Sequence, residues 1–266
     1  MRRIWLLALA LALGAAAPAA ADAPADPALA LAVAGPQRSP AFLARDAARH
    51  PLQELLFFGL RPDAAVVEIW PGGGYWTEIL APYLRERGRY YLAVPPQAGS
   101  ENAAALRRKL ASDPALYDKI TVTEFGRDHG DIAPAGTVDL ILTFRNLHNW
   151  MADGYAEAAL AAFARALKPG GVLGIEDHRA RDDVPQDPAA ANGYVRQDYA
   201  VMLAEQAGLR FVAASEISAN PRDTKDWPKG VWTLPPTFAL GEQDRATYAA
   251  IGEADNFVLK FQKPAD

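Results

Sequence analysis

The chain has 266 residues, half of them hydrophobic, which is enough for the core of one α/β domain. It carries 27 basic and 32 acidic side chains, and this net charge of −5 argues against a nucleic-acid-binding protein. Because cysteine is absent, disulfide bonds and a lipoprotein anchor are excluded.

The N-terminus has the layout of a secretory signal peptide. Arg2 and Arg3 precede an apolar run at 4–17, and a small-residue stretch ends at Ala21. A membrane-spanning helix needs about 20 apolar residues, more than this run offers. We therefore predict a cleaved signal peptide at 1–21 and a periplasmic or secreted protein without stable membrane insertion, an uncleaved anchor being the alternative. The paired arginines fit either a twin-arginine signal or an ordinary basic segment.

Composition divides the rest of the chain. The segment 22–38, rich in alanine and proline, is expected to be a flexible leader. Residues 39–266 are expected to form a single domain. Within it, the stretch at about 216–255 is rich in Pro, Trp and Gly and predicts an irregular insertion, which is either a lid or substrate wall or a plain surface excursion.

Predicted strands and helices alternate along the domain. A helical region begins at Ser39-Pro40, is split by Pro51 and ends near Gly59. Then follow a strand at 64–70, a helix at 75–87, a strand at 90–94, a helix at 101–110, strands at 120–125 and 138–144, a helix at 154–167, a strand at 172–176, a helix at 194–207, and strands at 210–215 and 256–262. This alternation predicts an α/β fold with a doubly wound, mostly parallel seven-stranded sheet and helices on both faces.

Four stretches carry a resemblance to a known family. They are VEIWPGGGY at 67–75, VDLIL at 138–142 with NLHN at 146–149, ALKPGG at 166–171, and FVLK at 257–260. With these stretches in this order, the chain resembles the class I S-adenosylmethionine-dependent methyltransferases, whose fold is Rossmann-like. It is most similar to a group of exported, poorly characterised members. The resemblance covers roughly residues 39–264.

The resemblance implies that S-adenosyl-L-methionine binds at the glycine turn. Gly72, Gly73 and Gly74 let backbone approach a ligand closely, and the helix that follows presents unpaired N–H groups. Glu68 matches the family's first-strand acid, which orients the methionine part of the cofactor, and a cap for the turn is its alternative role. Tyr75 follows the turn and, with Trp70 and Trp76, is expected to line an aromatic pocket, ordinary core residues being the alternative.

The chain departs from the family pattern in the nucleoside half of the site. Trp70 stands where the family usually has its first glycine. The second strand leads into Pro95-Pro96-Gln97 without the usual acid, so that Gln97 or Glu101 replaces it or nucleoside binding has been lost. After the third strand, Glu124 or Asp128 is expected to contact adenine, a solvated loop acid being the alternative.

Polar side chains follow the fourth and fifth strands, where ligands of open α/β sheets bind. His148 or His178 is a candidate general base for a hydroxyl acceptor, because imidazole titrates near neutral pH. Arg145 and Arg179 are candidates to hold an anionic substrate through bidentate hydrogen bonds. The plainer interpretation makes each histidine a hydrogen-bonded loop residue.

Other catalytic motifs are missing. No metal site is predicted, because no Glu-x-x-His or His-x-x-x-His spacing occurs, and Gly-x-Ser-x-Gly is absent as well. We therefore predict methyl transfer from S-adenosyl-L-methionine to an unidentified small-molecule acceptor. The alternative is a non-catalytic periplasmic binding or scaffold protein that has lost cofactor turnover, because this cofactor is made and used inside the cell.

Overall fold

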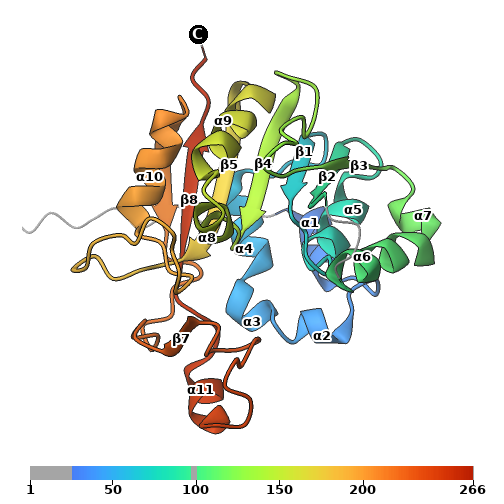
Figure 1. Ribbon diagram of the computed structural model, residues 1–266. Helices are drawn as coiled ribbons and strands as arrows, with labels where there is room; N and C mark the ends of the chain where they lie inside the picture. Colours follow the sequence, from blue (N-terminus) through green and yellow to red (C-terminus); the bar gives the residue numbers. More distant parts are fainter. Residues whose placement is uncertain (1–25, 97–100, 266) are drawn as a thin grey trace, which may run out of the picture.

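A seven-stranded sheet covered by helices on both faces forms the centre of the molecule (Figure 1). The computed structural model describes residues 26–96 and 101–265. The strand order is β3-β2-β1-β4-β5-β8-β6. Neighbouring strands from β3 to β5 are parallel, whereas β8 is antiparallel to both β5 and β6. The predicted fold class is confirmed.

The strands of the sheet lie where the sequence predicts them. They are β1 (Ala65–Ile69), β2 (Arg89–Val94), β3 (Ile120–Glu124), β4 (Val138–Phe144), β5 (Leu167–His178), β6 (Arg210–Ser215) and β8 (Asn256–Gln262). The main difference is in β5, which begins at Leu167 instead of Val172. Its first residues run through the predicted Lys-Pro-Gly-Gly turn, because Leu167 pairs with Val138 beyond a shift of register.

Helices pack on the two faces of the sheet in separate groups. In chain order they are α1 (Pro27–Ala34), α2 (Pro40–Leu43), α3 (Asp46–Arg49), α4 (Pro51–Phe58), α5 (Thr77–Leu84), α6 (Glu101–Ser112), α7 (Pro114–Tyr117), α8 (Leu147–Ala152), α9 (Ala156–Ala166), α10 (Gln197–Gln206) and α11 (Arg245–Ile251). Side chains alternate along β1, so that Val66 packs with α1, α4 and α5, whereas Val67 and Ile69 pack with α8, α9 and α10.

Helix α1 lies within the segment for which we expected a flexible leader. The Asp26 side chain accepts a hydrogen bond from the Leu29 amide at 2.9 Å and thus caps the helix. Leu29 is fully buried among side chains of α4 and α5. The prediction of a flexible leader is therefore wrong for this part. Alanine is a strong helix former, and burial of Leu29 in the core holds the helix in place.

The predicted signal peptide at 1–21 and residues 22–25 lie outside the described residues. Within the described ranges, no helix is both long and apolar enough to cross a membrane.

The predicted insertion forms a small lobe that includes β7 (Pro228–Val231) and α11, drawn in orange and red below the sheet in Figure 1. An apolar cluster of its own holds the lobe together, formed by Tyr194, Val231, Leu234, Tyr248 and Ala254. Asp223 ties the lobe to the domain, since its carboxylate accepts from the hydroxyl of Tyr194, outside the insertion, at 3.0 Å. The same carboxylate accepts from the Asp255 amide at the end of the lobe at 2.9 Å. This segment is thus packed against the sheet domain.

Candidate functional site

The three-glycine turn after β1 borders a cavity of about 230 Å³. Gly72 has a φ of 56°, in the left-handed region that favours glycine. A Cβ atom added at Gly72 would meet no heavy atom within 4 Å, and one added at Gly73 would first meet Phe42 Cζ at 3.5 Å. The turn therefore leaves room beside Gly72 and Gly73, which both line the cavity.

The next two residues of the turn have different surroundings. A Cβ atom at Gly74 would meet the Lys109 side chain at 3.1 Å, so Gly74 faces α6. Tyr75 lines the cavity, and its hydroxyl donates to Asp46 Oδ1 at 2.5 Å. The Arg49 guanidinium lies 4.4 Å from the centre of the Tyr75 ring, within cation-π distance.

Glu68 lies beneath this turn with a buried carboxyl group. Its Oε2 accepts hydrogen bonds from the Thr77 hydroxyl at 2.9 Å and from the Tyr90 hydroxyl. Its Oε1 is buried without a partner among the described residues. Burial raises the pKa of Glu68 to about 7, against the effect of these hydrogen bonds. Because Glu68 also lines the cavity, Oε1 is free to accept from a ligand there.

Trp70 replaces a glycine of the family pattern and still takes a left-handed conformation, with a φ of 51°. Such a φ is uncommon for a bulky residue and needs support from its surroundings. The indole Nε1 donates to the carbonyl of Phe125 at 2.9 Å, and the ring meets Trp150 edge-on with centroids 5.8 Å apart. The turn thus has a glycine-like backbone although it carries a tryptophan side chain.

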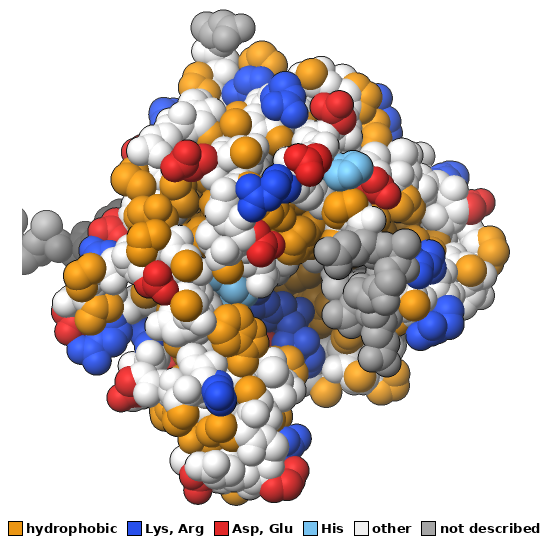
Figure 2. Space-filling model, viewed as in Figure 1, with side chains coloured by type: hydrophobic (Ala, Val, Ile, Leu, Met, Phe, Trp, Pro, Cys, Tyr) orange, Lys and Arg blue, Asp and Glu red, His pale blue; other side chains and the backbone are white. Residues whose placement is uncertain are grey.

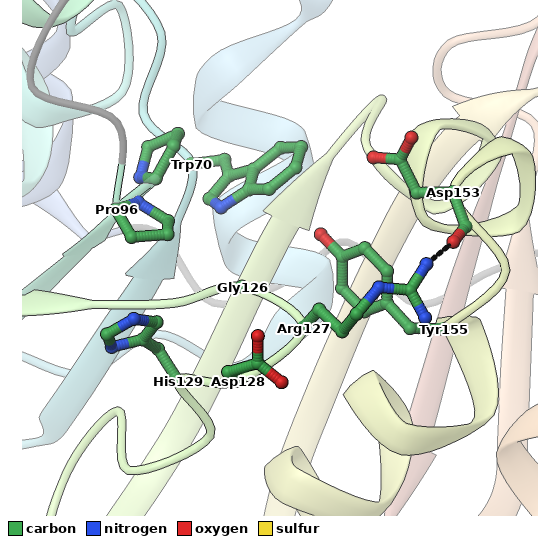
Figure 3. Close-up of a pocket in the computed structure, with 9 residues that line it drawn as sticks. Trp70, Pro96, Gly126, Arg127, Asp128, His129, Asp153 and Tyr155 are labelled. Atoms are coloured by element: carbon green, nitrogen blue, oxygen red, sulfur yellow. Dashed lines mark hydrogen bonds between the residues drawn. The ribbon is translucent and has the colours of Figure 1, made fainter.

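Trp70 also borders a second cavity, of about 550 Å³, next to the carboxyl ends of β2 and β3. Figure 3 shows Trp70 and Pro96 on one side of this cavity and Arg127 and Tyr155 across from them. The lining is completed by Pro95, Gly126, Asp128, His129 and Asp153. Two cavities with a common tryptophan therefore follow the carboxyl ends of β1, β2 and β3.

Of the residues expected to bind the nucleoside, only one lines the larger cavity among those that the structure describes. Gln97 lies outside the described residues. Glu124 is exposed at the end of β3, with Oε2 at 3.2 Å from His129 Nδ1, and it does not line the larger cavity. Asp128 does line it, and so does Asp153, which the sequence did not indicate. The role of Glu124 stays a prediction, and Asp128 is the better placed of the two alternatives.

Three arginines surround one carboxylate at the smaller cavity, in what we call the arginine cluster: Arg45, Arg49, Arg145 and Glu253. Glu253 accepts two hydrogen bonds of 2.7 Å from Arg45 and one of 3.2 Å from Arg145, and Arg49 Nε lies 3.6 Å away. Burial alone would raise the pKa of Glu253, but these cations outweigh it and hold that pKa below its ordinary value. All three arginines line the cavity, which therefore has a basic wall.

Two fully buried carboxyl groups, Glu54 and Glu176, lie behind the arginine cluster. Burial, reinforced by the charge of Glu176, raises the pKa of Glu54 well above its ordinary value. Burial also raises the pKa of Glu176, whose Oε1 accepts from Asn256 Nδ2 at 2.9 Å. These shifts favour the neutral forms of both carboxyl groups, which in that form do not offset the charge of the three arginines.

Arg145 joins the cluster through an unusual backbone. Its φ is 60°, and its amide donates to the carbonyl of Glu176 at 2.7 Å. A left-handed residue other than glycine costs of order 1–3 kcal/mol, and such strain is common at functional sites. Arg179, the other predicted anion binder, instead contacts Glu216 at 2.7 Å and lines a different cavity with alternating charges.

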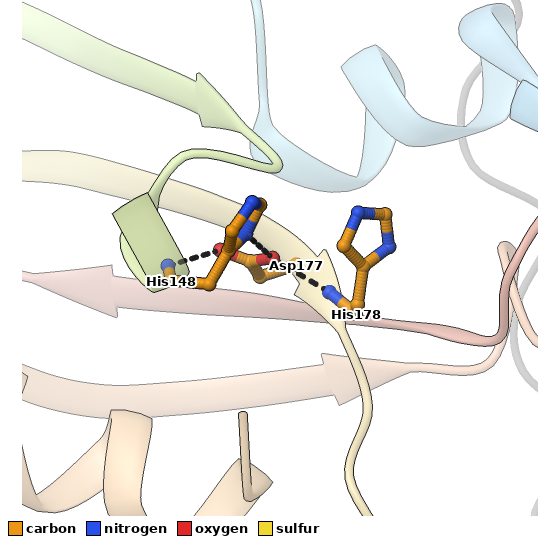
Figure 4. A group of neighbouring side chains, drawn as sticks. All are labelled: His148, Asp177 and His178. Carbon is orange, nitrogen blue, oxygen red and sulfur yellow. Dashed lines mark hydrogen bonds and ion pairs between the residues drawn. The ribbon is translucent and has the colours of Figure 1, made fainter. Parts of the chain in front are cut away.

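The two candidate histidines lie side by side at the ends of β4 and β5, on either side of Asp177 (Figure 4). His148 Nδ1 is 2.8 Å from Asp177 Oδ1, and the His148 amide donates to Oδ2 at 3.1 Å. His178 Nδ1 is 2.8 Å from Asn256 Oδ1. The ring centroids of His148 and His178 are 5.2 Å apart. His148 belongs to the short helix α8 rather than to a loop.

Burial separates the acid-base properties of these groups. It lowers the pKa of His178 to about 3, although Asp177 partly offsets it, so this imidazole is neutral and a weak base at neutral pH. Burial alone would raise the pKa of Asp177, but the neighbouring His148 outweighs it and keeps the pKa of Asp177 below its ordinary value. An ionised Asp177 therefore accepts a hydrogen bond from the His148 Nδ1–H, which leaves Nε2 as the free acceptor of the ring.

The lobe closes this side of the site. Trp232 meets His148 edge-on with ring centroids 6.1 Å apart, and Glu253 of the arginine cluster follows α11. In Figure 2 the hollow beside the lobe contains basic side chains with a histidine at its edge. The insertion therefore contacts both His148 and the arginine cluster, and its role as a lid or substrate wall stays a prediction.

Comparisons with known proteins agree with this architecture. No protein-family model and no curated protein matches the chain. Among solved structures, it is similar to an S-adenosylmethionine-dependent methyltransferase from Aquifex aeolicus, with a TM-score of 0.57 and 17% identity over 85% of this chain and 94% of the other. The chain therefore has the fold of class I methyltransferases.

Two further structures show how widely this fold is used. The (4+2)-cyclase SpnF matches with a TM-score of 0.59 and 14% identity, over 83% of this chain and 82% of its own. An arsenic(III) S-adenosylmethionine methyltransferase from Chlamydomonas reinhardtii matches with a TM-score of 0.51 and 14% identity, over 91% of this chain and 74% of its own. At these identities the similarity establishes the fold, and the function has to be argued from the site.

Proposed function

We propose that this protein transfers a methyl group from S-adenosyl-L-methionine to a small-molecule acceptor. The observation that carries the proposal is the position of the two cavities after the carboxyl ends of β1, β2 and β3. Arg145 and Asn146 line the smaller cavity and directly precede helix α8, which carries His148 with its Nδ1 at 2.8 Å from Asp177. In a sheet of this topology, ligands bind at this edge.

The residues around the two cavities fit the parts of this cofactor, which supplies a methyl group on a sulfonium when bound. Gly72 and Gly73 leave space for its methionine part, and the free Oε1 of Glu68 suits the ammonium group. The arginine cluster suits the carboxylate. The larger cavity offers Asp128 and Asp153 to the nucleoside.

In the proposed mechanism the chain positions the acceptor and accepts its proton. His148 Nε2 takes the proton of the acceptor hydroxyl, and Asp177 stabilises the imidazolium that results. His178 stays neutral and accepts a hydrogen bond from the acceptor, since its pKa of about 3 makes it a poor base. Arg145 holds an anionic part of the acceptor or of the cofactor.

A second candidate function is binding without methyl transfer. The described part of the chain has no acid directly after β2, where Pro95 and Pro96 line the larger cavity. SpnF, a cyclase by name, has the same fold. A binding or scaffold protein would also avoid the need for a cofactor supply outside the cytoplasm.

Calorimetric titration of the purified full chain with S-adenosyl-L-methionine and with its demethylated product separates the two functions. Methyl transfer requires that both ligands bind with a stoichiometry of one per chain. It also requires that they compete, because they would occupy the same site. If neither ligand binds, the binding or scaffold function replaces our proposal.

We also propose that the protein is exported and that cleavage after Ala21 leaves Asp22 as the first residue. The support is the basic, apolar and small-residue order of the first 21 residues. Mass spectrometry of the protein from the periplasmic fraction measures its N-terminus. An intact N-terminus in the membrane fraction would refute the cleavage.

A further inference from the structure

We propose that His148 and His178 together bind a divalent transition metal ion through their Nε2 atoms. Among the described residues, His148, Asp177 and His178 form a group whose potential ligand atoms lie within 4.8 Å of one another. The three come from two neighbouring strand ends, so no local spacing in the sequence indicated them. We did not predict this site from the sequence.

The separation of the two rings fits one shared ion. A metal ion lies about 2.1 Å from an imidazole nitrogen, which places it about 3.2 Å from the ring centroid. If the Nε2 directions of both rings meet at one ion, centroids 5.2 Å apart correspond to an angle of about 109° at the metal, close to the tetrahedral value.

The groups behind the histidines are those that commonly orient metal ligands. Metal-binding histidines usually donate their second ring N–H to a carboxylate or carbonyl oxygen. Here the Nδ1 of His148 pairs with Asp177, and the Nδ1 of His178 pairs with Asn256 Oδ1, both at 2.8 Å. Asn256 is itself fixed by donating Nδ2 to Glu176 at 2.9 Å. Both imidazoles are therefore held as the tautomer that presents Nε2.

The ligand types indicate the class of ion. Imidazole nitrogen suits Zn²⁺ and its neighbours in the first transition row better than Mg²⁺ or Ca²⁺. Two protein ligands leave coordination positions for water or for an oxygen of the acceptor. Metal binding does not depend on the cofactor. Where it combines with the proposed function, the ion would occupy His148 Nε2 and lower the pKa of a bound acceptor hydroxyl, whose proton would then pass to water instead of to His148.

The four histidines of the chain allow a matched test with Zn²⁺ as the probe. The full chain, without a histidine tag and after dialysis against a chelator, is titrated calorimetrically with Zn²⁺. We expect one ion per chain, and a loss of that binding in His148→Gln and in His178→Gln. His129→Gln is the control, because His129 is an exposed histidine that also lies near a carboxylate.

Asp177→Asn should weaken Zn²⁺ binding without abolishing it. Loss of an orienting carboxylate typically weakens metal binding 10- to 100-fold, and we expect a change in this range. The proposal is overturned if the parent chain does not bind Zn²⁺, or if the double variant His148→Gln/His178→Gln binds it as the parent does. Titration of the same variants with S-adenosyl-L-methionine tests the cofactor site independently, so failure of either proposal can be recognised.

Discussion

The two halves of the site are built in different ways. Around β1, β2 and β3 the cavity walls combine the glycine turn, prolines and aromatic rings with a few ionisable side chains such as Asp128 and Asp153, and Trp70 is common to both cavities. Around β4, β5 and β8 the walls are charged or titratable groups, many of them buried and bound to one another, such as Glu253 with three arginines. The first half offers open space between backbone and ring walls, whereas the second is dominated by buried charge and proton acceptors.

Because of this difference, substitutions in the two halves should affect different properties of the protein. A group added to the first half fills space that a ligand needs but breaks few contacts. A group removed from the second half leaves its partners buried without compensation, which is costly in a low-dielectric interior. Substitutions at the glycine turn should therefore alter binding, whereas those at buried titratable groups, Glu68 of the first half among them, should alter catalysis or stability.

The largest effect is expected from His148→Gln. Glutamine keeps a hydrogen-bonding side chain but removes the base, and such a loss typically lowers the rate 10²- to 10⁴-fold. Affinity for the cofactor should stay near that of the parent. Single-turnover rates with saturating cofactor, once an acceptor is identified, measure this. Parental rates in both His148→Gln and His178→Gln would show that the histidines are structural.

Glu253→Ala should destabilise the fold. It leaves Arg45, Arg49 and Arg145 without their common carboxylate, and breaking a buried ion pair costs roughly 3–5 kcal/mol. Because the Glu253 side chain is 14% exposed, we expect about 3 kcal/mol, measured by urea unfolding. The control is Glu216→Ala, which removes an exposed partner of Arg179 and should change the free energy of unfolding by less than about 0.5 kcal/mol.

Glu68, which lies in the first half of the site, should make the free energy of unfolding of the protein depend on pH. Its folded pKa of about 7 exceeds the ordinary value of 4.5, so its contribution is complete below pH 4.5 and is lost as the pH rises through 7. The shift corresponds to about 3 kcal/mol. Glu68→Gln should match the parent at pH 4 and be more stable at pH 8. Equal unfolding free energies at both pH values would contradict the shift.

The smallest effect on the fold is expected from Gly73→Asp. The new side chain would project beside the cofactor's carboxylate and weaken binding about tenfold or more, or about 1.4 kcal/mol. Its Cβ atom has an ordinary contact with Phe42 at 3.5 Å, so the melting temperature should change little. Gly73→Ala is the matched control for bulk without charge. Parental affinity in Gly73→Asp would remove the turn from the cofactor site.

The sequence predicted the sheet well because its strands are apolar runs bounded by Gly, Pro and charged residues. It also indicated Arg145, His148 and His178, because they follow strands whose ends must meet at one edge. Helix α8 and the folded lobe were missed, since a short helix and a Trp- and Pro-rich segment lack a clear period.

Contacts between distant residues were beyond sequence reasoning. Arg45 and Glu253 are 208 positions apart, and nothing in their local patterns relates them. The Asn256 contact with His178 spans 78 positions. The predicted roles of Tyr75, Gln97 and Glu124 in cofactor binding stay predictions. Local periodicity describes elements, whereas these pairs depend on how strands are ordered in the sheet.

Trp70 gives the protein an internal optical signal. Its indole borders both cavities, and its Nε1 donates to the Phe125 carbonyl. A ligand in either cavity would change the polarity around this ring and with it the wavelength of its fluorescence emission. Excitation at the red edge of tryptophan absorption, compared between the parent and Trp70→Phe, would therefore isolate the contribution of this one ring and report ligands that have not yet been identified.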